Sequence, residues 1–144
     1  MYKFIKKNLS HSLQNGNPRA LSNSSNRSHL GKEGEEFVVA NLQSRGYFIL
    51  DCNYRKRFGE IDIIAKKGNV IAFVEVKARI TKYFNLSEVI NYSKQKKIIL
   101  TAKHYVMSKG IKDKVLRFDI ALVEKQNNAY NLNYIKNAFT SNNE

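Results

Sequence analysis

The pattern of apolar and polar residues predicts a basic leader followed by one α/β domain. Residues 1–28 are polar, rich in serine and asparagine, and without a regular apolar repeat, so we expect a disordered leader. Residues 29–139 predict a helix, three strands, a helix, a strand and a weaker final strand, and residues 140–144 form a tail. This order is typical of a mixed central sheet that is covered by helices. The predicted elements are a helix capped by Ser28 and ended by Gly46, a strand over 47–53, two strands that contain 59–64 and 73–79, a short helical turn within 83–91, a helix capped by Ser93 and ended by Gly110, and strands over 115–124 and 129–135.

Two apolar runs in the middle of the chain predict a β-hairpin. The segment Lys66–Asn69 between them has the length and the Gly/Asn content of a tight connection, so the strands should pair antiparallel. Symmetric pairing about Lys67 and Gly68 places Glu60 opposite Glu75. The hairpin should therefore bring charged side chains of two strands together.

Because side chains alternate along each strand, this hairpin has one apolar face, predicted to be core, and one charged face. The charged face carries Glu60, Asp62, Ile64, Phe73, Glu75 and Lys77. Its carboxylates should repel one another unless a cation binds or one of them holds a proton. A hard divalent cation such as Mg²⁺ would meet this demand with a couple of carboxylates, water and phosphate oxygens. The alternative is the solvated face of an amphipathic hairpin, on which Lys77 screens the acids.

A polar side chain interrupts the apolar stripe of each predicted long helix. Glu35 falls between Val38 and Val39 on the first helix, and Gln95 shares a stripe with Ile98 on the second. A carboxylate that faces the core needs a partner, because an unpaired buried charge is costly. We therefore expect both side chains to converge on the charged hairpin face. The alternatives are that Glu35 forms an ion pair at the rim of the core, and that Gln95 is a surface residue at a fraying helix start.

A further charged pair lies in the strand over 115–124. Arg117 and Asp119 are two residues apart, so their side chains share one face of that strand. We expect this pair to be structural.

The charge of the chain favours a polyanionic partner. The 25 Lys and Arg against 12 Asp and Glu give a net charge of +13, and nucleic acid is the partner that fits best. The single cysteine, Cys52, excludes an intramolecular disulfide, and Cys and His lack the spacing of a zinc site. No apolar stretch approaches the length of a membrane span, and the first ten residues lack the apolar run of a signal peptide. We expect no membrane association and a cytoplasmic location.

Five short motifs give the sequence a family resemblance. They are Gly31-x-x-Gly34-Glu35, Asn53-x-Arg55-x-x-x-Gly59-Glu60-Ile61-Asp62-Ile63-Ile64-Ala65, Phe73-Val74-Glu75-Val76-Lys77-x-Arg79, Lys94-Gln95 and Arg117-Phe118-Asp119. In order and spacing, residues 29–139 resemble the YraN-like family of uncharacterised bacterial proteins. The resemblance implies the restriction-endonuclease-like fold of the PD-(D/E)xK nucleases, closest in style to Holliday junction resolvases.

The resemblance also implies roles for individual residues. Asp62 matches the motif aspartate, Glu75 and Lys77 match its E-x-K element, and Glu35 matches the acid that resolvase-like members supply from the first helix. Asp62, Glu75 and Glu35 would then bind Mg²⁺, with Mn²⁺ as an alternative ion. Lys77 and Gln95 would complete the catalytic set.

The function implied is a metal-dependent endonuclease that hydrolyses phosphodiester bonds in structured or branched DNA. The basic residues expected to contact nucleic acid are Arg55, Arg57, Arg79, Lys82, Lys94, Lys96 and Lys97. One alternative is a noncatalytic nucleic-acid-binding domain that retains the nuclease fold, and another is an accessory protein whose basic surface docks an acidic partner. DNA is favoured over RNA, and a homodimer that spans a junction is left open.

Overall fold

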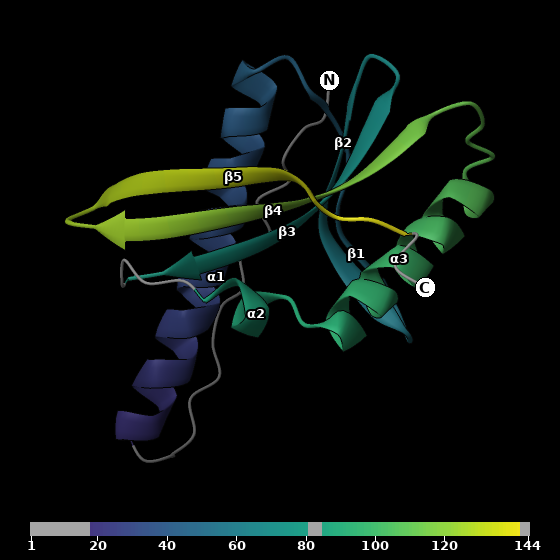
Figure 1. Cartoon of the computed structure of the whole chain (residues 1–144). Helices are drawn as coiled ribbons and strands as arrows, with labels where there is room; N and C mark the ends of the chain where they lie inside the picture. The colour runs from purple at the N-terminus through teal and green to yellow at the C-terminus, as the bar shows by residue number, and fades with distance from the viewer. Residues whose placement is uncertain (1–17, 81–84, 142–144) are drawn as a thin grey trace, which may run out of the picture.

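The computed structural model describes residues 18–80 and 85–141 of the chain, which form helices on a five-stranded sheet (Figure 1). The elements are α1 (Pro18–Ser44), β1 (Phe48–Lys56), β2 (Gly59–Lys67), β3 (Val70–Arg79), α2 (Leu86–Val89), α3 (Tyr92–Ser108), β4 (Val115–Gln126) and β5 (Ala129–Phe139). No helix within the described ranges is long and apolar enough to cross a bilayer.

The sheet is mixed, with the strands in the order in which they occur along the chain. Neighbouring strands are antiparallel except β3 and β4, which run parallel. A parallel pair needs a crossover connection, and the segment that contains α2 and α3 supplies it. The predicted mixed α/β sheet covered by helices is confirmed.

The sheet buries a hydrophobic core on each face. On one face Val38 and Leu42 of α1 pack with Ile63 and Val74. On the other face α3 packs over a second cluster, which includes the buried Phe73. The apolar hairpin face is core as predicted. The opposite face is core where it lies under α3, at Ile64 and Phe73. It carries charged side chains farther along β3, at Glu75 and Lys77.

The register of the hairpin differs from the prediction. A two-residue turn that begins at Gly68, where φ is +57°, pairs Lys67 with Val70. The prediction assumed a longer connection, so its register was wrong by two residues and Glu60 does not face Glu75. Because the side-chain period of a strand is two, a shift of two residues does not exchange the faces within the β2–β3 ladder. Beyond the ladder the prediction was wrong for Ile61, which packs with Ile64 and Phe73 and not with Ile63.

The first helix begins earlier than predicted. It starts at Pro18, not after a cap at Ser28, so residues 18–28 of the expected leader are helical and residues 1–17 lie outside the described ranges. Proline suits the first helical position because the N–H that it lacks has no partner there. The predicted end is confirmed, since Gly46 follows the helix with φ of +86°.

The remaining boundaries shift by a few residues. Asn91, not Ser93, caps α3, because its side chain accepts a hydrogen bond of 2.9 Å from the backbone N–H of Lys94. Gly110 follows the helix with φ of +62°, as predicted. The final strand is longer than expected and continues to Phe139.

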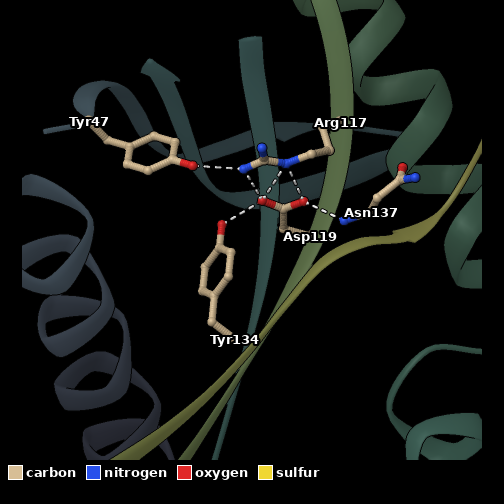
Figure 2. Close-up of polar contacts among 5 residues, drawn as sticks. All are labelled: Tyr47, Arg117, Asp119, Tyr134 and Asn137. Atoms are coloured by element: carbon tan, nitrogen blue, oxygen red, sulfur yellow. Dashed lines mark hydrogen bonds and ion pairs between the residues drawn. The ribbon is translucent and has the colours of Figure 1, made fainter. Parts of the chain in front are cut away.

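Arg117 and Asp119 form the centre of a buried polar network (Figure 2). Asp119 is fully buried, and both of its oxygens accept hydrogen bonds from the guanidinium of Arg117 at 2.8–3.1 Å. Tyr134 Oη donates to the same carboxylate at 2.7 Å, and the backbone N–H of Asn137 donates at 2.9 Å. Arg117 also donates to Tyr47 Oη at 2.9 Å. The predicted structural pair is confirmed, and its hydrogen bonds tie β4 to β5 and to the residue before β1.

Both outer strands of the sheet are irregular. Between Phe118 and Ile120 of β4 the facing strand β5 contains two extra residues, and Asp119 fills this gap with its hydrogen bond to Asn137. In β1 one extra residue, Leu50, interrupts the pairing with β2. In each case the extra backbone belongs to the edge strand.

Candidate active site

The predicted acidic site lies where β2 and β3 diverge. The ladder between them ends at the pair Ile63 and Val74, after which β2 continues beside β1 and β3 continues beside β4. We call this divergence the fork. Asp62 and Glu75 are the first residues beyond the last pair, one on each strand. Asp62 Oδ2 reaches across the fork and accepts a hydrogen bond of 2.8 Å from the backbone N–H of Val76.

Glu75 is held by a lysine of α3. Its side chain is only 7% exposed, and its Oε1 forms an ion pair with Lys94 Nζ. Lys94 lies in the first turn of α3, so the cap at Asn91 fixes the helix start that delivers this cation to β3. A buried carboxylate needs such a partner, because burial without one disfavours the charged form.

A close contact between α1 and β3 brings Glu35 to the same region. A Cβ atom at Gly34 would lie 2.7 Å from the Cβ of Ala78, so only glycine permits this approach of helix to strand. The next residue, Glu35, accepts a hydrogen bond of 3.2 Å from Asn53 Nδ2. Asn53 of β1 has φ of +53°, a left-handed conformation that asparagine tolerates better than most residues.

The surroundings of the fork disfavour the ionisation of Asp62 and of Glu35. Burial, followed by repulsion from Glu75, raises the pKa of Asp62 to about 8, against the stabilising bond from Val76 N–H. Burial also raises the pKa of Glu35, with smaller contributions from the charges of Glu60 and Glu75 and an opposing one from its bond to Asn53. Carboxylates from α1, β2 and β3 therefore share one electrostatic environment, as expected from the sequence.

The donor set at the fork fits a hard cation better than a soft one. It consists of carboxylate oxygens, and an added positive charge would favour their ionised forms. Within residues 18–80 and 85–141, however, no three Asp, Glu, His or Cys side chains are gathered as a metal site. The ammonium of Lys94 supplies the positive charge at Glu75.

The two other predicted catalytic residues are placed differently. Lys77 lies two residues beyond Glu75 on β3, is half-buried, and forms no hydrogen bond or ion pair with the described residues. Gln95 Nε2 donates to the carbonyl of Ile90 at 3.5 Å, a loose contact across the start of α3. The charges of Glu35 and Glu75 both act on Asp62, although no hydrogen bond among the described residues joins these three acids. No described contact joins Gln95 to any of them.

Several predicted nucleic-acid contacts line a shallow cavity beside the fork. Arg55, Arg57 and Lys97 surround a hollow of about 380 Å³ at the β1–β2 turn. Arg55 Nε donates to Glu60 Oε1 at 2.8 Å, so the positive charge of Arg55 is balanced locally by that carboxylate. At Gly59 a Cβ would lie 2.4 Å from Thr101 Oγ1, which shows how closely the turn packs on α3.

The other predicted contacts are dispersed. Lys96 Nζ lies 4.5 Å from the centre of the Tyr92 ring, and both residues line a hollow of about 230 Å³ on α3. Arg79 lies opposite Glu124 in the register of the parallel strands β3 and β4, at the end of the ladder. Lys82 lies outside the described residues. Three of the seven basic residues, Arg55, Arg57 and Lys97, thus line the cavity beside the fork.

Sequence reasoning missed two contributors to the site. Asn53 holds Glu35, and the backbone N–H of Val76 holds Asp62. An asparagine within an apolar strand is a signal for a special backbone conformation, and it was available in the sequence. The Val76 contact depends on the fork, which strand periodicity does not reveal.

The fold and the site define the class of protein: an α/β domain whose acidic side chains gather where two strands of a mixed sheet diverge. The model of the Uncharacterised protein family UPF0102 matches residues 34–123, which include the fork, α3 and most of β4. The chain belongs to this family.

Close relatives carry the same family name. A UPF0102 protein of Dictyoglomus turgidum is 42% identical over 117 residues, which cover 79% of this chain and 99% of the relative. A UPF0102 protein of Persephonella marina is 47% identical over 110 residues, covering 76% and 91%. One from Alkaliphilus oremlandii is 45% identical over 113 residues, covering 76% and 97%. The family assignment predicted from the motifs is confirmed.

Proposed function

We propose that this protein is a metal-dependent endonuclease with a restriction-endonuclease-like fold, acting on structured or branched DNA. The observation that carries the proposal is the pair Asp62 and Glu75 on either side of the fork, with Lys77 next on the same strand. Two acids this close, one buried and one partly buried, are unfavourable for stability alone, since the pKa of Asp62 is raised to about 8. Perturbed carboxylates in such a position are typical of functional sites.

The residues would divide the reaction as follows. Asp62, Glu75 and Glu35 would hold Mg²⁺ or Mn²⁺, which when bound polarises a phosphate and acidifies a water molecule. Lys77 would orient the attacking water and offset negative charge on the phosphate as the bond to the leaving oxygen breaks. Gln95 would donate a hydrogen bond to water or phosphate after leaving the Ile90 carbonyl.

Lys94 has two proposed roles. It neutralises Glu75 in the free protein and would turn to a backbone phosphate when a metal ion takes its place. Its side chain is 40% exposed, so the ammonium has solvent on one side and a route away from the acid. The cavity of Arg57 and Lys97 would grip phosphates on the same side, giving affinity without sequence choice.

The test is cleavage of labelled single-stranded, duplex, flap and four-way DNA in Mg²⁺, Mn²⁺ or EDTA. We expect cleavage in a divalent ion and its loss in Asp62→Asn and Lys77→Ala. Lys136→Ala, which removes an exposed lysine of β5, is the charge-matched control and should cleave normally. Equal cleavage by all the variants would assign the activity to a contaminant and refute the site.

The ion pair of Glu75 with Lys94 also supports a second candidate, a noncatalytic nucleic-acid-binding domain. In that case Lys94 would be a permanent partner of Glu75. Binding of DNA that weakens with salt, without cleavage in either metal ion, would favour this function. A Lys94→Met variant separates the two: it should bind Mn²⁺ more tightly if the site is a metal site, and gain no metal affinity otherwise.

A further inference from the structure

A groove with an apolar floor and a basic rim lies at the turn end of the hairpin, away from the fork. Its volume is about 790 Å³. Lys66 and Ile71, which line it, flank the β2–β3 turn. Lys66 lies four residues from Asp62 along β2, a separation of roughly 13 Å at the rise of a strand. The groove is therefore a different surface from the proposed active site.

The floor of the groove leaves apolar surface uncovered. Its apolar and aromatic lining residues are Tyr47, Phe48, Ile49, Leu50, Ile71, Tyr105 and Ile111. The Phe48 side chain is 74% exposed, although it begins a strand whose other apolar side chains are partly buried. Exposed apolar surface that is rimmed by polar groups marks an interaction site more often than a simple solvent-facing surface.

The rim of the groove is positively charged. Lys66, Lys109 and Lys114 line it, and no acidic residue does. Lys114 Nζ donates to Asn69 Oδ1 at 3.2 Å, and Lys109 Nζ lies 5.8 Å from the centre of the Tyr105 ring. None of the three lysines forms an ion pair with a carboxylate of the described residues. Their charge is available to a partner.

Charge distinguishes among the possible occupants. Residues 1–17 of this chain contain three lysines and no acid, so they would be repelled by the rim. A second copy of the chain brings a net charge of +13 and is disfavoured for the same reason. Nucleic acid has the right charge, but single strands stack on several exposed rings. Of the rings that line the groove, Tyr47 and Tyr105 are buried, at 6% and 3% exposed, and Phe48 is the exposed one.

We infer that the groove binds an acidic peptide segment of another protein. Bulky apolar side chains of the segment would lie on the floor around Phe48, and its carboxylates would face Lys66, Lys109 and Lys114. Apolar anchors supply affinity, and complementary charge supplies the rate and selectivity of association. The inference concerns a protein partner and is independent of the nuclease proposal.

The experiment measures binding of labelled nine-residue peptides to the full chain by fluorescence anisotropy. The probe alternates glutamate with leucine and phenylalanine. The first control peptide has lysine in place of glutamate, and the second has serine in place of the apolar residues. An unstructured DNA oligonucleotide is a third control. We expect the acidic apolar peptide to bind at least about tenfold more tightly than either control peptide. The serine peptide lacks the apolar anchors, and the lysine peptide lacks the charge that complements the rim.

Variants locate the binding site. Phe48→Ser and the double variant Lys66→Ala/Lys109→Ala should each weaken binding by roughly fivefold or more, because they remove an exposed anchor and the rim charge. Leu100→Ser, an exposed apolar residue on α3 outside the groove, and Lys136→Ala should bind as the wild type does. The wild type, the groove variants and the controls should share one circular dichroism spectrum.

Four results would overturn the inference: no binding of the acidic apolar peptide, equal binding of the lysine peptide, equal loss in the control variants, or a dimer that Phe48→Ser dissociates. Oligonucleotide binding that Phe48→Ser abolishes would assign the groove to nucleic acid instead. Loss of nuclease activity in Asp62→Asn would leave the peptide result unchanged.

Discussion

Neutralising Asp62 should stabilise the folded protein in a pH-dependent way. The Asp62→Asn variant keeps an oxygen that can accept the hydrogen bond from Val76 N–H, and it removes the charge that burial and Glu75 disfavour. A carboxyl group whose pKa is raised in the folded state lowers stability as it ionises. For Asp62 the loss begins near the ordinary pKa of 3.8 and is complete above a pH of about 8.

The size of the effect follows from the shift in pKa. Raising the pKa of Asp62 from 3.8 to about 8 corresponds to an upper limit of about 6 kcal/mol, at about 1.4 kcal/mol for each pH unit. Relaxation of solvent and neighbouring side chains in the partly open fork reduces this, and we expect a gain of about 2 kcal/mol or more for Asp62→Asn at high pH. At low pH, where the carboxyl is protonated in both states, the gain should vanish.

The assay is urea unfolding of wild type and variant in EDTA at about pH 3, below the ordinary pKa of 3.8, and at about pH 9, with equal m-values required for the comparison. Asp113→Asn is the matched control, because Asp113 is exposed between α3 and β4 and asparagine tolerates its positive φ of 58°. A gain for Asp62→Asn that is the same at both pH values, or a loss at high pH, would refute the electrostatic account of the fork.

Three further predictions concern packing, the buried network and the metal. Gly34→Ala should lose about 1–3 kcal/mol of unfolding free energy because its Cβ would overpack against β3, whereas Gly31→Ala, with open space around it, should gain up to about 1 kcal/mol in the same urea titration. Asp119→Asn should lower the free energy of unfolding by about 3–5 kcal/mol, while Glu60→Gln, which breaks an exposed ion pair, should lower it by less than about 1 kcal/mol. Similar losses in the two variants would contradict the buried role of Asp119. Added Mg²⁺ should raise the urea midpoint of wild type and not of Asp62→Asn, and equal responses would count against a metal at the fork.

The sequence was most informative where a regular period decides the structure. Alternation placed Asp62 and Glu75 on one hairpin face, and it paired Arg117 with Asp119. The register was missed because it depends on the length of the turn at Gly68, which sequence symmetry alone does not determine. Within the β2–β3 ladder the prediction therefore had the correct faces with the wrong facing residues.

Contacts between distant segments were less accessible. Lys94 was expected to meet phosphate, yet it forms an ion pair with Glu75, because the start of α3 lies over β3 in the folded chain. The early start of α1 was missed because serine and asparagine are poor helix formers, although Pro18 is a favourable first helical residue. The closeness of α1 to the fork depends on Gly34, which the motif contained without revealing its contact with Ala78.

The extra residues in β1 and β5 have a consequence for the behaviour of the protein in solution. A regular outer strand offers a straight row of unpaired amides on which another chain can polymerise. Here Leu50 interrupts that row on one side, and the two-residue insertion around Asn137 interrupts it on the other. Open-ended stacking of copies through sheet extension is thereby discouraged on both sides of the sheet.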